Sequence, residues 1–313
     1  MMRRMWRWLV GSGVLGCGLS VLASQTPPPQ PSQPAVVALT MDDLPSHGPR
    51  PPGSSRAEIA TRIIAALRDA KSPPVYGFIN AGQLEKKPED AEVLKLWRAA
   101  GFPLGNHAFS HMDLHANSAD AFEQDIAANE PALRTFMGSS DWHWFRYPYL
   151  REGDTPEKYK TVRTFLQQRR YRVAQVTLSF DDYAYNGPYA RCLAKNDTNG
   201  IEWLQKSYLA RAERSLTKGQ ADARTLFGRD IKHIMLLHIG GFETVMLPRL
   251  LTLLEARGFT LTTLDDASSD DAYRAEPAGK AWSGTFLEQQ MDAGGEPRPP
   301  ADGFMQEVAA VCQ

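Results

Sequence analysis

Segments typical of strands and of helices alternate along most of this sequence, and this alternation restricts the fold more than any other feature. The apolar run at 35–40 predicts a buried strand, and the spacing of Ile59, Ile63 and Leu67 predicts a helix at 56–70. Further strands are expected at 75–80, 102–107, 142–149, 171–180, 231–238 and 259–264, and further helices at 89–101, 119–136, 155–170, 201–214 and 243–258. Such an alternation with short links predicts an α/β fold, namely a closed or nearly closed (β/α) barrel of about seven parallel strands.

The two ends of the chain depart from this pattern. Residues 1–23 combine a basic start, an apolar stretch and small residues before a cleavage point, which is typical of a secretory signal peptide. Residues 24–35 are rich in proline and predict an extended linker. The barrel domain is expected at 36–267, and 268–313 form a C-terminal extension whose structure the sequence leaves open.

The signal-like segment predicts export, with the protein periplasmic, attached to the cell envelope or secreted. An uncleaved membrane anchor is the alternative, and a stretch that loosely resembles a lipid-attachment site makes Cys17 a candidate lipid anchor. Cys192 and Cys312 are two further thiols for an oxidising compartment, but the sequence does not show whether they pair. The formal net charge of −1 indicates neither a nucleic acid partner nor an anionic membrane surface, and no protein partner is implied.

Polar side chains stand where five of the predicted strands end. In parallel α/β folds, functional groups gather at this edge of the sheet. The residues concerned are Asp42 and Asp43, His107 and His111, the run 146–149, Asp181 and Asp182, and His238.

A metal site can be assembled from two of these strand ends. His107 and His111 are four residues apart, which on a helical turn places both imidazoles on one face, although two polar residues on a surface helix show the same spacing. Asp42 and Asp43 can reach one cavity together only if their strand is ending, because neighbours on a strand point to opposite faces. One carboxylate and two imidazoles suit zinc, and the other carboxylate is then a candidate base. The alternative for the aspartates is a turn or a helix cap.

Four short motifs occur in an order that resembles a known family. They are ALTMDDLP, NHAFSH, FRYPY and LLH, and the resemblance covers about residues 36–265. The family is that of the polysaccharide deacetylases, the chitin-deacetylase-like enzymes of carbohydrate esterase family 4. The resemblance implies a distorted (β/α) barrel, a divalent metal that is most often zinc, and the removal of acetyl groups from sugars.

The resemblance also implies roles for individual residues. It makes Asp43 a metal ligand together with His107 and His111, and it makes Asp42 the general base, held by Arg146.

The implied catalytic set also includes Tyr149, His238 and an acidic residue near position 182. The backbone N–H of Tyr149 helps to bind the oxyanion, and His238 is the general acid. The match is weakest at LSFDDY, where Ser179 stands in place of the family's first aspartate, so any tuning of the arginine or the acid histidine is lost or falls to Asp181 or Asp182.

Three residues near these motifs are candidates for substrate binding. Tyr147 stands where the family often has proline, and the rings of Tyr147 and Tyr183 are expected to stack on sugar faces, with core packing as the rival interpretation. His47 follows Asp43 closely and lines the cleft unless it is only solvated.

These observations predict an exported, zinc-dependent hydrolase that deacetylates a carbohydrate. A hydrolase for small amides or imides, a non-catalytic glycan-binding protein on the same fold, and a structural envelope protein are the alternatives. The sequence leaves open the glycan, the choice between an N-acetyl and an O-acetyl bond, and the choice of zinc over cobalt or nickel.

Overall fold

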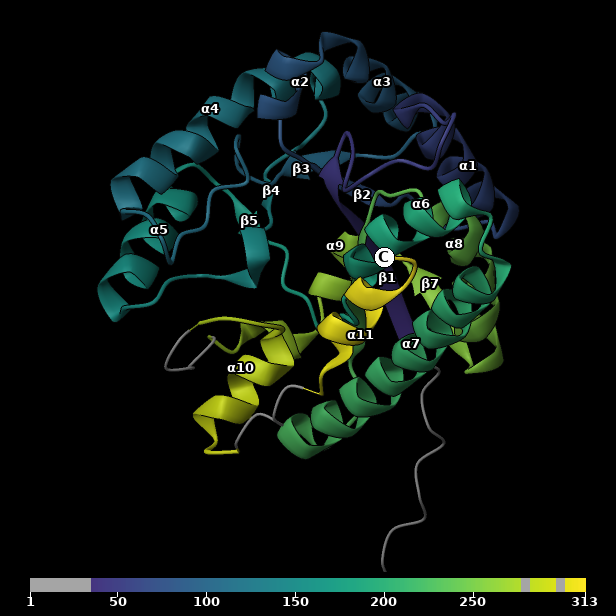
Figure 1. Ribbon diagram of the computed structural model, residues 1–313. Coiled ribbons are helices and arrows are strands. Elements are labelled where there is room, and N and C mark those ends of the chain that lie inside the picture. Colours follow the sequence, from purple (N-terminus) through teal and green to yellow (C-terminus); the bar gives the residue numbers. More distant parts are fainter. Residues whose placement is uncertain (1–34, 277–281, 297–301) are drawn as a thin grey trace, which may run out of the picture. The chain divides into compact units, whose positions relative to one another are not determined.

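A computed structural model describes residues 35–276, 282–296 and 302–313, all of which belong to one compact unit (Figure 1). Their strands form a seven-stranded sheet in which every pair is parallel. The strands are β1 (Ala35–Leu44), β2 (Tyr76–Ile79), β3 (Leu104–Asn106), β4 (Trp144–Phe145), β5 (Arg172–Val173), β6 (Lys232–His238) and β7 (Phe259–Thr262). The predicted α/β fold is therefore confirmed, as a parallel sheet curled into part of a barrel.

The long strand β1 organises the sheet. The strand order is β5-β4-β3-β2-β1-β6, and β7 also pairs with β1. The first part of β1 pairs with β7 and its last part with β2, while β6 follows it from Val36 to Asp42. Strand β6 pairs with one edge of β1 along most of its length. The other edge of β1 is therefore shared by β2 and β7. This arrangement brings the carboxyl ends of β1 and β6 side by side.

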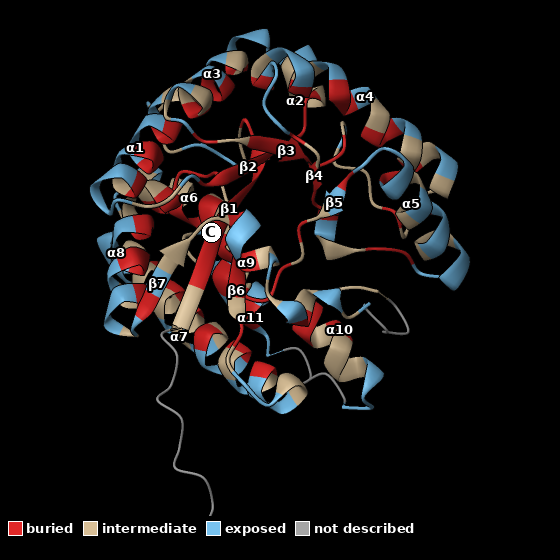
Figure 2. Ribbon diagram, turned by 180° about the vertical axis from the view of Figure 1, so that it is seen from behind, coloured by how far each residue is buried: buried red, intermediate tan, exposed pale blue. Residues whose placement is uncertain are grey.

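Helices cover the outside of the curled sheet, with exposed residues on their outer faces and buried residues toward the strands (Figure 2). The helices are α1 (Arg56–Asp69), α2 (Gly82–Lys86), α3 (Ala91–Ala99), α4 (Ala119–Met137), α5 (Pro156–Gln168), α6 (Asn186–Lys195), α7 (Thr198–Phe227), α8 (Glu243–Ala256), α9 (Leu264–Ser268), α10 (Phe286–Ala293) and α11 (Phe304–Ala310). Short 3-10 turns lie at Pro88–Asp90, Pro148–Leu150, Asp182–Tyr185 and Asp271–Arg274. None of the helices in the described ranges is both long enough and apolar enough to span a bilayer.

Local sequence explains why two of these helices begin and end where they do. Ser55 and Glu58 form a capping box at the start of α1, which satisfies backbone N–H groups that have no partner within the helix. Helix α7 begins after Asp197, whose side chain accepts a hydrogen bond from the Gly200 N–H, and ends at Gly228 in a left-handed conformation. The prediction of a helix at 201–214 was too short, because the helix continues through Gly219 to Phe227.

The strand predicted at 171–180 is largely wrong. Only Arg172–Val173 belong to the sheet, and further on Leu178 makes an isolated bridge to Met235 of β6. The run is apolar because it is buried beside β6, and burial alone does not distinguish a strand from an irregular segment. The sheet is consequently open between β5 and β6.

The C-terminal extension covers this opening. The Glu152 N–H donates to the Trp282 carbonyl at 2.7 Å, and the Phe286 N–H donates to the Val176 carbonyl at 2.7 Å. The sequence left the structure of residues 268–313 open. The described part of this extension contains α10 and α11.

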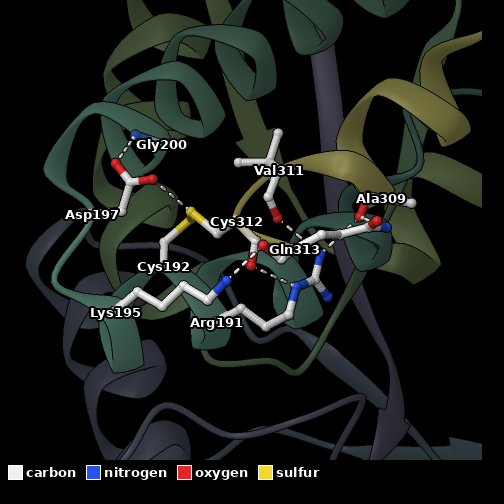
Figure 3. Close-up of a disulfide and its surroundings, with 9 residues drawn as sticks. All are labelled: Arg191, Cys192, Lys195, Asp197, Gly200, Ala309, Val311, Cys312 and Gln313. Atoms are coloured by element: carbon white, nitrogen blue, oxygen red, sulfur yellow. Dashed lines mark hydrogen bonds between the residues drawn. A yellow bond between two sulfur atoms is a disulfide. The ribbon is translucent and has the colours of Figure 1, made fainter.

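A disulfide attaches the last residues of the chain to α6. Cys192 and Cys312 are bonded to each other, which answers the question that the sequence left open (Figure 3). Arg191 adds hydrogen bonds from its guanidinium to the carbonyls of Ala309 and Val311 at 2.8 and 2.9 Å. The predicted signal peptide at 1–23 and the linker at 24–35, apart from Ala35, lie outside the described residues.

Candidate metal centre and active site

Asp42 and Asp43 face the same cavity because the backbone turns within β1. Asp43 has a φ of 66°, in the left-handed region, and the register between β1 and β2 shifts between Met41 and Leu44. A left-handed residue costs about 1–2 kcal/mol, and aspartate tolerates this conformation better than most residues. The two carboxylates come together through this local turn, and β1 itself continues to Leu44.

His107 and His111 lie side by side, but they do not lie on a helix. Residues 107–111 form an irregular loop after β3, with Ala108 and His111 both at a φ of 59°. The side chain of Asn80 holds this loop by donating to the carbonyls of His107 and Ala108 at 2.6 and 2.9 Å. The two imidazole centroids are 4.9 Å apart. The predicted pair is therefore brought together, but the helical turn invoked for it was wrong.

Asp43, His107 and His111 form a ligand set. In the described ranges they are the one group of three His, Cys, Asp or Glu residues whose donor atoms all lie within 4.8 Å of one another. Oδ1 of Asp43 is 3.5 Å from Nε2 of His107 and 3.3 Å from Nε2 of His111. That oxygen is buried and has no hydrogen-bond partner in the described structure.

Hydrogen bonding determines which form of His107 is present. Its Nδ1 lies 2.7 Å from the carbonyl oxygen of Arg146, which can only accept, so Nδ1 carries the proton. Nε2 then presents a lone pair toward the lone pairs of Asp43 Oδ1. Electron-rich atoms in this arrangement are stable around a cation, and a histidine whose second nitrogen is bonded to a carbonyl is typical of metal ligands. The residues present therefore fit a divalent metal ion.

The electrostatics of the three side chains favour their metal-binding forms. Burial lowers the pKa of His107 and of His111 to about 4, so both are neutral at pH 7. Burial alone would raise the pKa of Asp43. A hydrogen bond from His47 and the charge of His238 outweigh burial and hold this pKa well below its usual range, so Asp43 is ionised.

Arg146 holds the second carboxylate. Its Nη1 donates to both oxygens of Asp42 at 3.2 Å, and its Nε donates to the Ala174 carbonyl at 2.7 Å. Nη2 donates to Thr40 Oγ1 at 3.1 Å, so the guanidinium is fixed on three sides. Burial raises the pKa of Asp42 to about 6, against the opposing charge of Arg146. A carboxylate that titrates in this range is suited to general base catalysis near neutral pH.

His238 ends β6 directly beside Asp42, with which it pairs in the sheet. Asp182 accepts the backbone N–H of His238 at 2.7 Å and the Nδ1–H of its ring at 2.9 Å. Burial lowers the pKa of His238, but the charge and hydrogen bond of Asp182 outweigh burial and raise this pKa to about 9. Asp182 therefore orients and charges the histidine, while Asp181 pairs instead with Arg211 at 3.0 Å.

The predicted substrate-binding residues have different surroundings. Tyr183 and His47 line the cavity, and their rings lie 5.2 and 5.0 Å from the ring of His238. Tyr147 also borders the cavity, but its side chain is buried, stacked on Phe122 and packed against Phe145. The expectation that its ring stacks on a sugar is wrong, and core packing is the correct interpretation.

Tyr149 lies at the mouth of the cavity. It has a φ of 59°, its side chain is 57% exposed, and its ring centroid lies 4.4 Å from that of His111. Tyr149 thus places an exposed aromatic ring beside the ligand cluster. The sequence had predicted a role only for its backbone N–H, in binding the oxyanion.

The cavity has a volume of about 720 Å³ and extends well beyond the ligand cluster. Its remaining wall comes from helix α7 and the C-terminal extension, which sequence reasoning did not assign to the site. The residues are Arg211, Arg214, Ser215 and Lys218 from α7, and Ser283, Gly284, Thr285, Glu288 and Asp302 from the extension. The spacing of the first four along one helix face was visible in the sequence, but nothing there indicated which cavity that face borders.

Comparison with known proteins bears on the family and the fold of this chain. Residues 30–167 match the model of the polysaccharide deacetylase family. Over this stretch the chain is similar to the polysaccharide deacetylases. The resemblance seen in the motifs is confirmed, and the comparison with curated protein sequences found no match.

Solved structures of a chitin deacetylase and of CE4 family pseudoenzymes share the fold. The chitin deacetylase from the fungal pathogen Colletotrichum lindemuthianum is 20% identical, with 76% of this chain and 89% of that chain covered and a TM-score of 0.51. A CE4 family pseudoenzyme from Bacillus anthracis is 16% identical, with 75% and 66% covered and a TM-score of 0.50. A mutant of a CE4 family pseudoenzyme with restored enzymatic activity is 17% identical, with 75% and 68% covered and a TM-score of 0.51. At these identities the likeness establishes the fold.

Proposed function

We propose that the protein is a metal-dependent hydrolase that removes acetyl groups from a carbohydrate. The observation that carries the proposal is the ligand cluster, in which the buried Oδ1 of Asp43 lies 3.5 and 3.3 Å from the Nε2 atoms of His107 and His111 and has no hydrogen-bond partner in the described structure. A carboxylate held by an arginine and a histidine held by a carboxylate line the same cavity, as an acid–base reaction requires.

The proposed reaction is the hydrolysis of an acyl bond. Asp43, His107 and His111 would hold the metal, which when bound supplies the Lewis acidity that acidifies water and polarises an acyl carbonyl. Asp42 takes a proton from the attacking water, while Arg146 keeps this carboxylate in place and ionised.

The second half of the reaction breaks the bond to the leaving group. The backbone N–H of Tyr149 donates to the developing oxyanion, and such a donor contributes roughly 3–4 kcal/mol. Charged His238 then protonates the departing nitrogen or oxygen as the acyl bond breaks. Water has then been divided between acetate and a free amine or hydroxyl. The proton on Asp42 returns to solvent, and His238 takes up a proton from solvent to restore its charged form. Zinc is the metal we propose, because imidazole and carboxylate ligands suit it.

A non-catalytic glycan-binding role is the second candidate. It is raised by the description of a structure with this fold as a pseudoenzyme. The pairing of Asp42 with Arg146 and of His238 with Asp182 favours catalysis, because a binding protein has no need of a charged buried acid beside a buried base.

We also propose that the protein is exported, as the signal-like N-terminal residues indicate. The disulfide between Cys192 and Cys312 supports this proposal, because such bonds persist in oxidising compartments.

The test is a measurement of zinc content together with acetate release. The purified protein is offered a panel of acetylated glycans, N-acetylated and O-acetylated, and a matched panel of small amides and imides that lack sugar. Stoichiometric zinc and acetate release from glycans are expected. Turnover of the small amides alone would favour the amidohydrolase, and glycan binding that persists without zinc or turnover would favour the binding protein.

A further inference from the structure

His47 contacts the ligand cluster of Asp43, His107 and His111 although it is not part of that cluster. It lies four residues after Asp43, and its Nδ1 is 2.6 Å from Oδ2 of Asp43. Because Asp43 is ionised and can only accept, the Nδ1 of His47 is the donor. The bond engages one carboxylate oxygen of Asp43 and leaves the other, Oδ1, directed toward His107 and His111.

The surroundings of His47 hold its ring in this position. Its backbone N–H donates to the Ile239 carbonyl at 2.7 Å, which attaches the loop after β1 to the loop after β6. The ring also contacts Tyr183 edge-on at 5.7 Å and lies 5.0 Å from the ring of His238. The imidazole is therefore a fixed donor, in contrast to a solvated loop histidine whose rotamers interconvert.

A fixed donor matters at Asp43 because this carboxylate has few other restraints. Its backbone is left-handed, and Oδ1 has no hydrogen-bond partner in the described structure. Without a bond on Oδ2, the carboxylate is free to rotate about its Cβ–Cγ bond and to withdraw Oδ1 from the two imidazoles. Hydrogen bonds that orient a ligand in this way commonly decide the affinity of a metal site.

We propose that His47 is a positioning residue that orients Asp43 for metal binding, an inference that rests on the proposed metal-dependent function. His47 acts through Asp43, since Nδ1 is occupied by the carboxylate and His47 does not belong to the group of donor atoms that lie within 4.8 Å of one another. The bond also restricts Asp43 to a single ligating oxygen, which leaves more of the metal's coordination sites for water and substrate.

The test measures zinc affinity in competition with a chelator, which does not depend on turnover. The substitution His47→Ala is expected to weaken zinc binding roughly 10- to 100-fold. His47→Asn and His47→Gln form a matched pair, because the asparagine amide lies where Nδ1 was and can still donate to Asp43, whereas the longer glutamine carries its amide beyond that point. Asn is expected to retain most of the affinity and Gln to lose it.

His143→Ala is the control. His143 also donates from Nδ1 to an aspartate, at 2.8 Å from Asp141, but this pair is outside the cavity. We expect His143→Ala to leave zinc affinity unchanged, and His47→Ala and His47→Gln to reduce it. If the Asn variant, the Gln variant and the parent all bind zinc with equal affinity, the proposed role of His47 is overturned, while the proposed metal site still stands. A parent protein that binds no zinc would overturn the proposed metal site, and the role of His47 with it.

Discussion

Two groups of histidine and aspartate lie at one cavity, one of them with its aspartate buried and bonded to the histidine, and their histidines are held in opposite protonation states. In the ligand cluster of Asp43, His107 and His111, burial lowers the pKa of both histidines to about 4. In the acid pair of His238 and Asp182, the carboxylate raises the pKa of the histidine to about 9. The same residue types therefore present lone pairs in the first group and a proton in the second.

The difference lies in the group that accepts from Nδ1. The Nδ1–H of His107 is donated to a main-chain carbonyl, which carries no net charge, whereas that of His238 is donated to the carboxylate of Asp182. A carbonyl selects one tautomer and leaves the ring neutral, while a buried carboxylate also stabilises the charged ring. The hydrogen-bond partner, more than the histidine, thus separates a metal ligand from a general acid.

The strongest test of this comparison removes a member of the ligand cluster. His107→Ala and Asp43→Ala are each expected to abolish stoichiometric zinc binding and to reduce acetate release by roughly 10³-fold or more, because a catalytic metal supplies several kcal/mol. Elemental analysis and an acetate assay measure both quantities. The thermal unfolding of the metal-free parent provides the control for the fold, and full zinc content in either variant would contradict the ligand assignment.

The acid pair is expected to respond differently when its histidine is removed. His238→Ala should reduce kcat by roughly 10²- to 10⁴-fold, the usual contribution of a positioned proton donor. Zinc content should remain that of the parent, because His238 is outside the ligand set. A variant that loses zinc along with activity would show that the two groups are not separate.

A smaller effect is expected when the carboxylate of the acid pair is neutralised. His238 donates a proton only while charged, so activity falls as the pH rises through its pKa. Asp182→Asn removes the charge that raises this pKa, and the alkaline limb of the pH–rate profile should move to lower pH by about 1–3 units. Asp181→Asn is the matched control, since Asp181 pairs with Arg211. An identical shift in both variants would argue against a specific role of Asp182.

The smallest effect is expected at a histidine that belongs to neither group. His115 lies four residues after His111 but outside the ligand set. His115→Ala should leave zinc content unchanged and activity within about twofold, as is usual for substitutions away from a site. A clear loss of zinc in this variant would extend the ligand cluster beyond the three residues named.

Most of the fold could be predicted from the sequence, because hydrophobic periodicity reports burial directly. The helices at α1, α3, α4, α5 and α8 agree with their predicted positions to within a few residues. The prediction failed where burial and strand pairing do not coincide, as at 174–180, where an apolar segment follows β5 and lies beside β6 with only an isolated bridge from Leu178 to Met235. It also failed at the C-terminal extension, whose short helices depend on contacts with distant residues.

The chemistry of the site was predictable in kind but not in geometry. The six principal residues, Asp42, Asp43, His107, His111, Arg146 and His238, were all named from the sequence. In the structure five of them line one cavity, and Arg146 is buried against Asp42. The helical turn invoked for His107 and His111 is a loop, and the ring expected from Tyr147 is in the core. A four-residue spacing occurs in helices and in loops, and an aromatic side chain occurs in binding sites and in cores. Neither feature therefore identifies its structural setting.

The sequence by itself determined most of the helices and strands of the barrel and which reactive groups stand at the ends of the strands, since both depend on local residue order. Only the tertiary structure decided that Asp182 charges His238, that His47 bonds to Asp43, and that the C-terminal extension borders the cavity. Each of these contacts joins separate segments or requires a left-handed turn that residue order does not specify. The pKa of a buried group depends on its neighbours in space, so the division between metal ligand and acid exists only once the chain has folded.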